Sequence, residues 1–228
     1  MKKENLDTKE KMSEKELAKR YTLFIISLFF SALGVAITKK GELGVSPISS
    51  VANVLSLKFT AFSLGNWLII WNCILIAGQV LLLRTKFHFI QLLQLPLSVL
   101  FGYFTDFGMH LVSFFSVDSY LERFSMIIIG TIVLGFGIAL SVIANVVMNS
   151  GEAFVKAVSD TIHKEFGNVK IVFDISCVVI AVVLSLVCFQ HTIVGTREGT
   201  LIAAFCTGFV VKFFCKKFTM PLNRLLQH

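Results

Sequence analysis

Apolar stretches long enough to cross a membrane recur along this chain. A hydrocarbon core of roughly 30 Å requires about 20 apolar residues in a helix. Hydrophobic residues make up 55% of the sequence and charged residues only 15%. A soluble domain of 228 residues needs more charge than this to cover its surface. The sequence therefore predicts an all-α fold, a polytopic helical bundle whose surroundings are the lipid bilayer.

We expect about six membrane spans and two shorter helices. The spans are expected at residues 21–38, 66–83, 89–115, 125–147, 169–189 and 199–214. The short helices are expected at 48–62 and 153–166, each after a polar break. The predicted domains are a tail (1–20), membrane repeat 1 (21–115), a connector (116–123), membrane repeat 2 (124–214) and a second tail (215–228).

The net charge of +7 does not indicate nucleic acid, and we expect no nucleic-acid partner. Lys and Arg gather at the ends of the spans and in the two tails, as they do in membrane proteins. The first 20 residues mix Lys with acids and contain no apolar core, so they do not resemble a signal peptide. The basic excess of both tails predicts that both termini are cytoplasmic.

The two halves of the chain match each other in order. The segment 34–37 (GVAI) corresponds to 137–140 (GIAL), and the Gly-Asn pair at 65–66 corresponds to the pair at 167–168. Each match lies roughly a hundred residues after its counterpart, a period that indicates duplication of one unit. We therefore predict a two-fold internal repeat.

The polarity of the short helices favours half-helices over full spans. The second one carries Lys156, Asp160 and His163, and a charge at the bilayer centre costs at least about 2.5 to 3.5 kcal/mol. A re-entrant helix avoids this cost where protein or a water-filled cavity surrounds it. Three spans in each half would make the repeats inverted. Eight spans stay open as the alternative, because the distribution of Lys and Arg separates the two arrangements only slightly.

Three small motifs resemble the YczE/YyaS/YitT group of bacterial membrane proteins. They are a glycine-rich first span, the Gly-x-Ser-Pro break at 44–47, and the Gly-Asn pair that opens the third segment, repeated once. The resemblance covers residues 20–222. It implies a bacterial cytoplasmic membrane and a function that is largely unassigned. Gly151-Glu152-Ala153 stands where the group more usually has a Gly-Pro-type break followed by an acid.

Polar residues at and near the two breaks are the candidate substrate-binding residues. If both short helices begin near the midplane, their N-terminal N–H groups point into one cavity and favour an anionic guest or a carboxylate. Simple capping and breaking of the helices is the alternative role. The candidates are Ser46, Pro47, Ser49, Ser50, Asn53, Asn72, Asp106, Ser150, Gly151, Glu152, Asp160 and Asp174.

Two acids in the predicted spans carry different expectations. Asp106 lies beside Gly102 and Gly108, so we expect Asp106→Asn to weaken ligand binding more than Asp174→Asn. Asn72 and Asp174 occupy matching places in the two halves, and contacts between helices are the simpler explanation for both.

The sequence offers no catalytic motif, and we expect neither an enzyme nor a cofactor. The five cysteines lie in apolar surroundings without a Cys-x-x-Cys pair, so no metal site is expected. The paired breaks favour a small secondary transporter or permease with a small-molecule substrate at a midplane site. The alternative is a membrane protein that regulates or scaffolds a partner complex. A channel is disfavoured because no filter motif is present. The oligomeric state stays open, with a homo-oligomer as one option.

Overall fold

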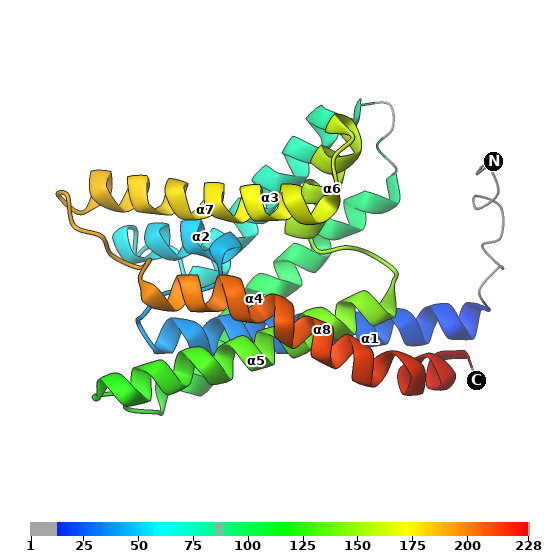
Figure 1. Cartoon of the computed structure of the whole chain (residues 1–228), viewed down its shortest axis with the longest axis horizontal. Coiled ribbons are helices and arrows are strands. Elements are labelled where there is room, and N and C mark those ends of the chain that lie inside the picture. The colour runs from blue at the N-terminus through cyan, green and yellow to red at the C-terminus, as the bar shows by residue number, and fades with distance from the viewer. Residues whose placement is uncertain (1–12, 85–86, 88, 228) are drawn as a thin grey trace.

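A computed structural model describes residues 13–84, 87 and 89–227 (Figure 1). Residues 1–12 and 228, which belong to the two predicted tails, lie outside the described residues.

Each half of the chain contains a long helix, a short helix and two further long helices. The first half comprises α1 (Glu14–Lys40), α2 (Pro47–Lys58), α3 (Leu64–Leu83), the 3-10 helix η2 (Phe89–Leu93) and α4 (Gln94–Ser113). The second comprises α5 (Tyr120–Ala144), α6 (Ser150–Ile162), α7 (Phe166–Cys188) and α8 (Glu198–Gln227). The described residues contain no strand, so the predicted all-α fold is confirmed. The same order of helices in both halves is what a duplicated unit would produce. The two-fold internal repeat itself stays a prediction.

Within the described residues, six helices are long and apolar enough to cross a membrane: α1, α3, α4 together with η2, α5, α7 and α8. In contrast, α2 has 12 residues and α6 has 13. At 1.5 Å per residue each short helix reaches only about 20 Å, less than the hydrocarbon core. Both have the length of a half-helix.

Several boundaries differ from the sequence expectation. Helix α1 begins at Glu14, inside the predicted first tail, and α8 runs through the predicted second tail to Gln227. Helix α5 ends at Ala144 because Asn145 adopts a left-handed conformation with φ 51°. In α1 and α8, polar residues continue the helix beyond the point where hydropathy alone would end the apolar span.

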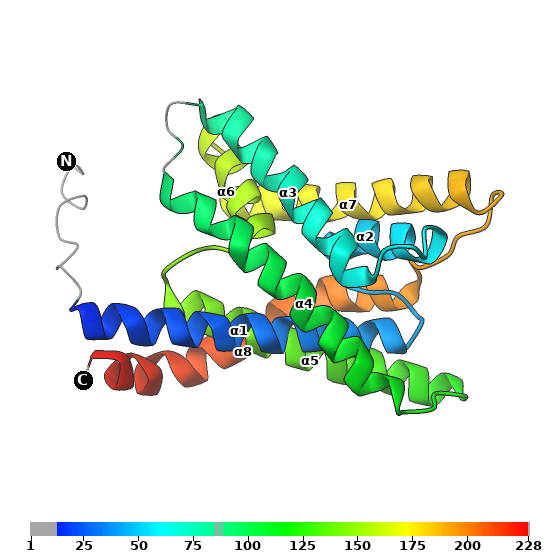
Figure 2. The same cartoon turned by 180° about the vertical axis from the view of Figure 1, so that it is seen from behind.

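The start of α1 and the end of α8 lie at the same end of the bundle, which we call the terminal end (right in Figure 1, left in Figure 2). The Lys19 ammonium donates a hydrogen bond to the Leu225 carbonyl at 3.3 Å there. Loops 114–119 and 189–197 lie at the opposite end. An even number of crossings between the two chain ends follows from this arrangement.

Helices α1 and α5 are antiparallel and closely packed. Near the terminal end, Arg20 of α1 donates hydrogen bonds to the carbonyls of Ile143 and Ala144, in the last turn of α5, at 3.4 and 3.2 Å. At the opposite end, Glu42 pairs with Arg123 at 2.6 Å. Arg20 thereby satisfies carbonyls that a helix C-terminus leaves without partners.

Glycines allow this close approach of α1 and α5. A Cβ at Gly34 would lie 2.4 Å from the backbone nitrogen of Leu134, and one at Gly137 would lie 2.4 Å from that of Ser31. Small residues that bring backbones together are the usual means by which membrane helices associate. Helix α4 packs against α1 of this pair, and α8 packs against α5.

Candidate functional site

The first break turns the chain back into the bundle and starts α2 there. Leu43 and Val45 are buried, and Gly44 has a φ of +118° that other residues rarely adopt. A Cβ at Gly44 would also lie 2.3 Å from the Thr200 hydroxyl, so only glycine fits. Pro47 then supplies the first residue of α2, where its missing N–H is harmless.

The second break turns the chain back into the bundle and starts α6 in contact with α2. Asn149 is the N-cap and Ser150 the first helical residue. A Cβ at Gly151 would lie 3.0 Å from the Ile48 side chain, so the first turns of the two short helices touch. From this meeting point α2 runs towards the opposite end, whereas α6 runs obliquely along α3 and only partly towards the terminal end (Figures 1 and 2).

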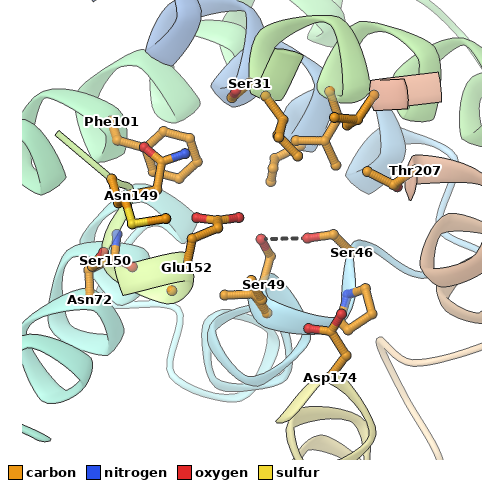
Figure 3. A pocket seen from close by; sticks show the side chains of 18 of the residues that line it. Ser31, Ser46, Ser49, Asn72, Phe101, Asn149, Ser150, Glu152, Asp174 and Thr207 are labelled. Carbon is orange, nitrogen blue, oxygen red and sulfur yellow. Dashed lines mark hydrogen bonds between the residues drawn. The ribbon is translucent and has the colours of Figure 1, made fainter. Parts of the chain in front are cut away.

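A central cavity of about 510 Å³ lies where the two short helices meet. All eight α-helices of the described residues and both breaks contribute residues to its wall, and the wall is largely apolar. Figure 3 shows Ser46 and Ser49 on one side of the space and Asn149, Ser150 and Glu152 on another. Segments some hundred residues apart in the sequence therefore share one cavity.

Eight of the twelve candidate residues line this cavity. They are Ser46, Pro47, Ser49, Asn72, Ser150, Gly151, Glu152 and Asp174. The Ser46 hydroxyl donates a hydrogen bond to the Ser49 hydroxyl at 3.0 Å, across the first turn of α2 (Figure 3). Neither Ser46 nor Asn149 caps its helix with its side chain. The simple capping role considered for Ser46 therefore does not occur.

Three titratable side chains line the cavity: Glu152, Lys170 and Asp174. The Lys170 ammonium contacts both carboxylate oxygens of Asp174, at 2.6 and 2.7 Å, one turn apart on α7. The carboxylate of Glu152 points into the open space (Figure 3). Among the described residues, no other side chain hydrogen bonds to it or pairs with it.

An amide network closes one wall of the cavity. The Gln79 and Gln94 side chains donate to each other at 3.0 and 3.1 Å, and Gln79 also donates to the Ser150 carbonyl at 3.2 Å. A smaller cavity of about 230 Å³ shares Gln94 and Met148 with the central one. The two cavities thus adjoin at the amide network, on the side of α6.

Four candidate residues lie outside the central cavity. The Ser50 hydroxyl donates to the Pro47 carbonyl at 2.6 Å, within α2. Asn53 accepts a hydrogen bond from Lys39 and donates to the Gly195 carbonyl, which ties α2 to α1 and to loop 189–197. Asp160 lines the smaller cavity and pairs with Lys156 at 2.9 Å.

Asp106, the fourth of these, holds the start of α3. Its carboxylate accepts hydrogen bonds from the Gly65 backbone N–H at 2.9 Å and from the Ser63 hydroxyl at 2.5 Å. The glycines beside Asp106 pack against helices: a Cβ at Gly102 would contact Ile69, and one at Gly108 would contact Ala36. The structure thus gives no support to the expectation that these glycines admit a ligand beside Asp106.

Sequence reasoning missed several cavity residues, above all Lys170. A Lys four residues before an Asp inside an apolar span is a detectable signal, because both charges are tolerable there only as a pair. Gln94 and Ser98 of α4 and Thr207 of α8 also line the cavity. Their positions depend on how each helix is rotated, which their spacing in the sequence does not reveal.

No group of three or more His, Cys, Asp or Glu side chains arranged to hold a metal ion occurs in the part of the chain that the structure describes. The charged groups of the cavity are two carboxylates and one ammonium on two helices.

The fold and the cavity define a polytopic helical membrane protein, whose described residues form six helices long and apolar enough to cross a membrane and two short helices that meet at the cavity. The chain belongs to the family of unknown function DUF6198, which it matches over residues 18–216. No curated protein and no solved structure matches the chain.

Proposed function

We propose that the protein is a small secondary transporter or permease that binds a small-molecule substrate in the central cavity. The observation that carries the proposal is the meeting of α2 and α6, one from each half, at a single cavity. Discontinuous helices from two halves are a recurrent way to build a transporter site near the midplane.

The directions of the short helices support alternating access. From their meeting point α2 runs towards the opposite end, whereas α6 runs obliquely along α3 and partly towards the terminal end (Figures 1 and 2), and in our proposal each short helix blocks one exit from the cavity. Inverted repeats would make the two coverings equivalent by pseudo-symmetry, and rocking one half against the other would open them in turn. A scaffold protein needs neither the cavity nor the paired half-helices.

The remaining features of the proposal follow from the sequence. We place the protein in a bacterial cytoplasmic membrane with both termini cytoplasmic, because basic residues concentrate in both tails. Kinship with the YczE/YyaS/YitT group belongs to the same proposal. It includes no enzymatic activity, no cofactor and no nucleic-acid partner.

Two exposed glycines provide a matched test. Neither Gly208, which lines the cavity, nor Gly167, which does not, has any atom within 4 Å of an added Cβ. Gly208→Phe should therefore fold and obstruct the cavity, and Gly167→Phe should fold and leave it open. We expect uptake of solutes from a panel of labelled cationic, neutral and anionic compounds into proteoliposomes, lost in Gly208→Phe and retained in Gly167→Phe.

The rival function is regulation or scaffolding of a partner complex. A protein of this kind would take up no solute above the level of empty liposomes, and Gly208→Phe would behave like Gly167→Phe. That result would contradict the transporter.

A further inference from the structure

The charges of the central cavity do not balance. Lys170 and Asp174 neutralise each other through two hydrogen bonds of 2.6 and 2.7 Å. Ionised Glu152 then leaves the cavity with one uncompensated negative charge, because no other titratable side chain among the described residues lines it. An unpaired charge away from water is costly, so this carboxyl group requires either a proton or a cationic partner.

The carboxylate of Glu152 already occupies the position at the N-terminus of α6 where an anionic ligand would bind. Helix N-termini attract anions, and Glu152 lies in the first turn of α6 with its carboxylate directed into the space that Ser46 and Ser49 of α2 also line (Figure 3). A second carboxylate would be repelled by the first. The sequence expectation of an anionic guest therefore gives way to a cation.

The cavity walls select for an apolar body on that cation. Phe24, Leu28, Phe101 and Leu134 contribute apolar surface, and an aromatic face such as that of Phe101 attracts a cation. The cavity is also not sealed, since Ala204 and Gly208 of α8 and Ile171 of α7 line it and are exposed. This opening lies between two membrane helices, where an amphipathic solute can arrive from the bilayer.

We propose that the cavity binds a small organic cation with an apolar body, in exchange for a proton on Glu152. The cation and the proton compete for one carboxylate. As the cation binds, the proton leaves the Glu152 carboxyl oxygen for water, and the reverse exchange releases the cation. This inference rests on the proposed transport function and makes the protein a proton-coupled exchanger.

Among the described side chains that line the central cavity, Glu152 is the one titratable group without a charged partner, so we assign the proton exchange to it. Helix α7 presents Lys170 and Asp174, which satisfy each other. Helices α2, α3 and α4 present Ser46, Ser49, Asn72, Gln94 and Ser98, and none of these carries a charge. Lys156 and Asp160, further along α6, pair with each other at the smaller cavity.

Phenyltrimethylammonium is the probe that tests the proposal, with benzyl alcohol and benzoate as the neutral and anionic probes of similar size. Calorimetric titration of the purified protein, in two buffers with different ionisation enthalpies, measures both affinity and proton release. We expect the cation alone to bind, with release of about one proton and an affinity that falls about tenfold per pH unit on acidification. Glu152→Gln should weaken binding at least tenfold and abolish the proton release.

Asp160→Asn is the matched control, since it removes an acid from the same helix outside the central cavity and should behave like wild type. Binding of benzoate instead of the cation, or unchanged binding in Glu152→Gln, would overturn the proposal. The proton count of the wild-type protein keeps the test decisive even where Glu152→Gln does not fold, because cation binding without proton release also overturns it.

Proteoliposomes with an internal pH dye separate this proposal from the transport function. A cation gradient that drives protons the other way supports both. Cation binding with proton release but no proton flux would refute transport and leave the cation site standing. Uptake of another solute class that is sensitive to Gly208→Phe, without cation binding, would refute the cation site and leave the transporter standing.

Discussion

Asp106 and Asp174 are both acids within apolar spans of the sequence, but they make different contacts in the structure. Asp106 accepts hydrogen bonds at the start of α3, outside the central cavity, whereas Asp174 lines that cavity and holds Lys170. Rotation of each helix about its axis decides which acid meets the cavity. From this arrangement we predict that Asp174 matters more for ligand binding than Asp106, the opposite of the order expected from the sequence.

For Asp106→Asn we expect a stability defect without a binding defect. An amide accepts the Gly65 hydrogen bond less strongly than a carboxylate, so the variant should lose about 1 to 2 kcal/mol of stability. Cation affinity should stay within about twofold of wild type.

Asp174→Asn frees Lys170 inside the cavity and should weaken cation binding at least about tenfold by repulsion. Thermal unfolding and calorimetric titration in detergent compare the two. Equal affinities in both variants would argue against a role for the Lys170–Asp174 pair.

At the scale of elements, backbone contact holds α1 to α5, while α8 stands further from its neighbours around Gly208. Gly137→Ala forces a methyl group to within 2.4 Å of the Ser31 backbone nitrogen, and this overlap cannot relax by a rotamer change. We expect a loss of at least about 1 to 3 kcal/mol. Gly208→Ala should be neutral or slightly stabilising, because alanine favours the helix and meets no atom. Detergent melting curves of the pair measure the difference, and equal destabilisation would contradict this packing.

The break before α2 makes a second prediction at this scale. Ser46→Leu together with Pro47→Leu replaces the hydroxyl that bonds to Ser49 and the proline that starts the helix. The variant should insert into the membrane but lose any response to a ligand, because the helix start defines one wall of the cavity. Ser56→Leu, on α2 away from the cavity wall, is the control. A ligand response that survives in the double variant would make the break only a connector.

The whole molecule has two ends, and the position of loop 114–119 distinguishes six spans from eight. In a variant without its five native cysteines, Asp118→Cys and Arg197→Cys should react with an impermeant thiol reagent added outside cells, and Lys164→Cys should not. All three positions are exposed, so burial does not confound the comparison. Eight spans with the same N-terminal orientation place position 118 inside, and protection of Asp118→Cys alone would establish that arrangement.

The sequence by itself determined the six apolar helices, the two short helices and the breaks that start them. Hydropathy over about 20 residues and turn chemistry at Gly44 and Pro47 are local properties, and a chain in lipid must satisfy its backbone within each helix. Only the tertiary structure decided which polar groups share the cavity. It brought the Lys170–Asp174 pair of α7 to the cavity that Glu152 of α6 lines, placed Asp106 at the start of α3, and gave Gly137 a tight backbone contact but Gly208 open space. Those outcomes depend on the rotation and tilt of each helix against its neighbours, which packing over the whole bundle sets.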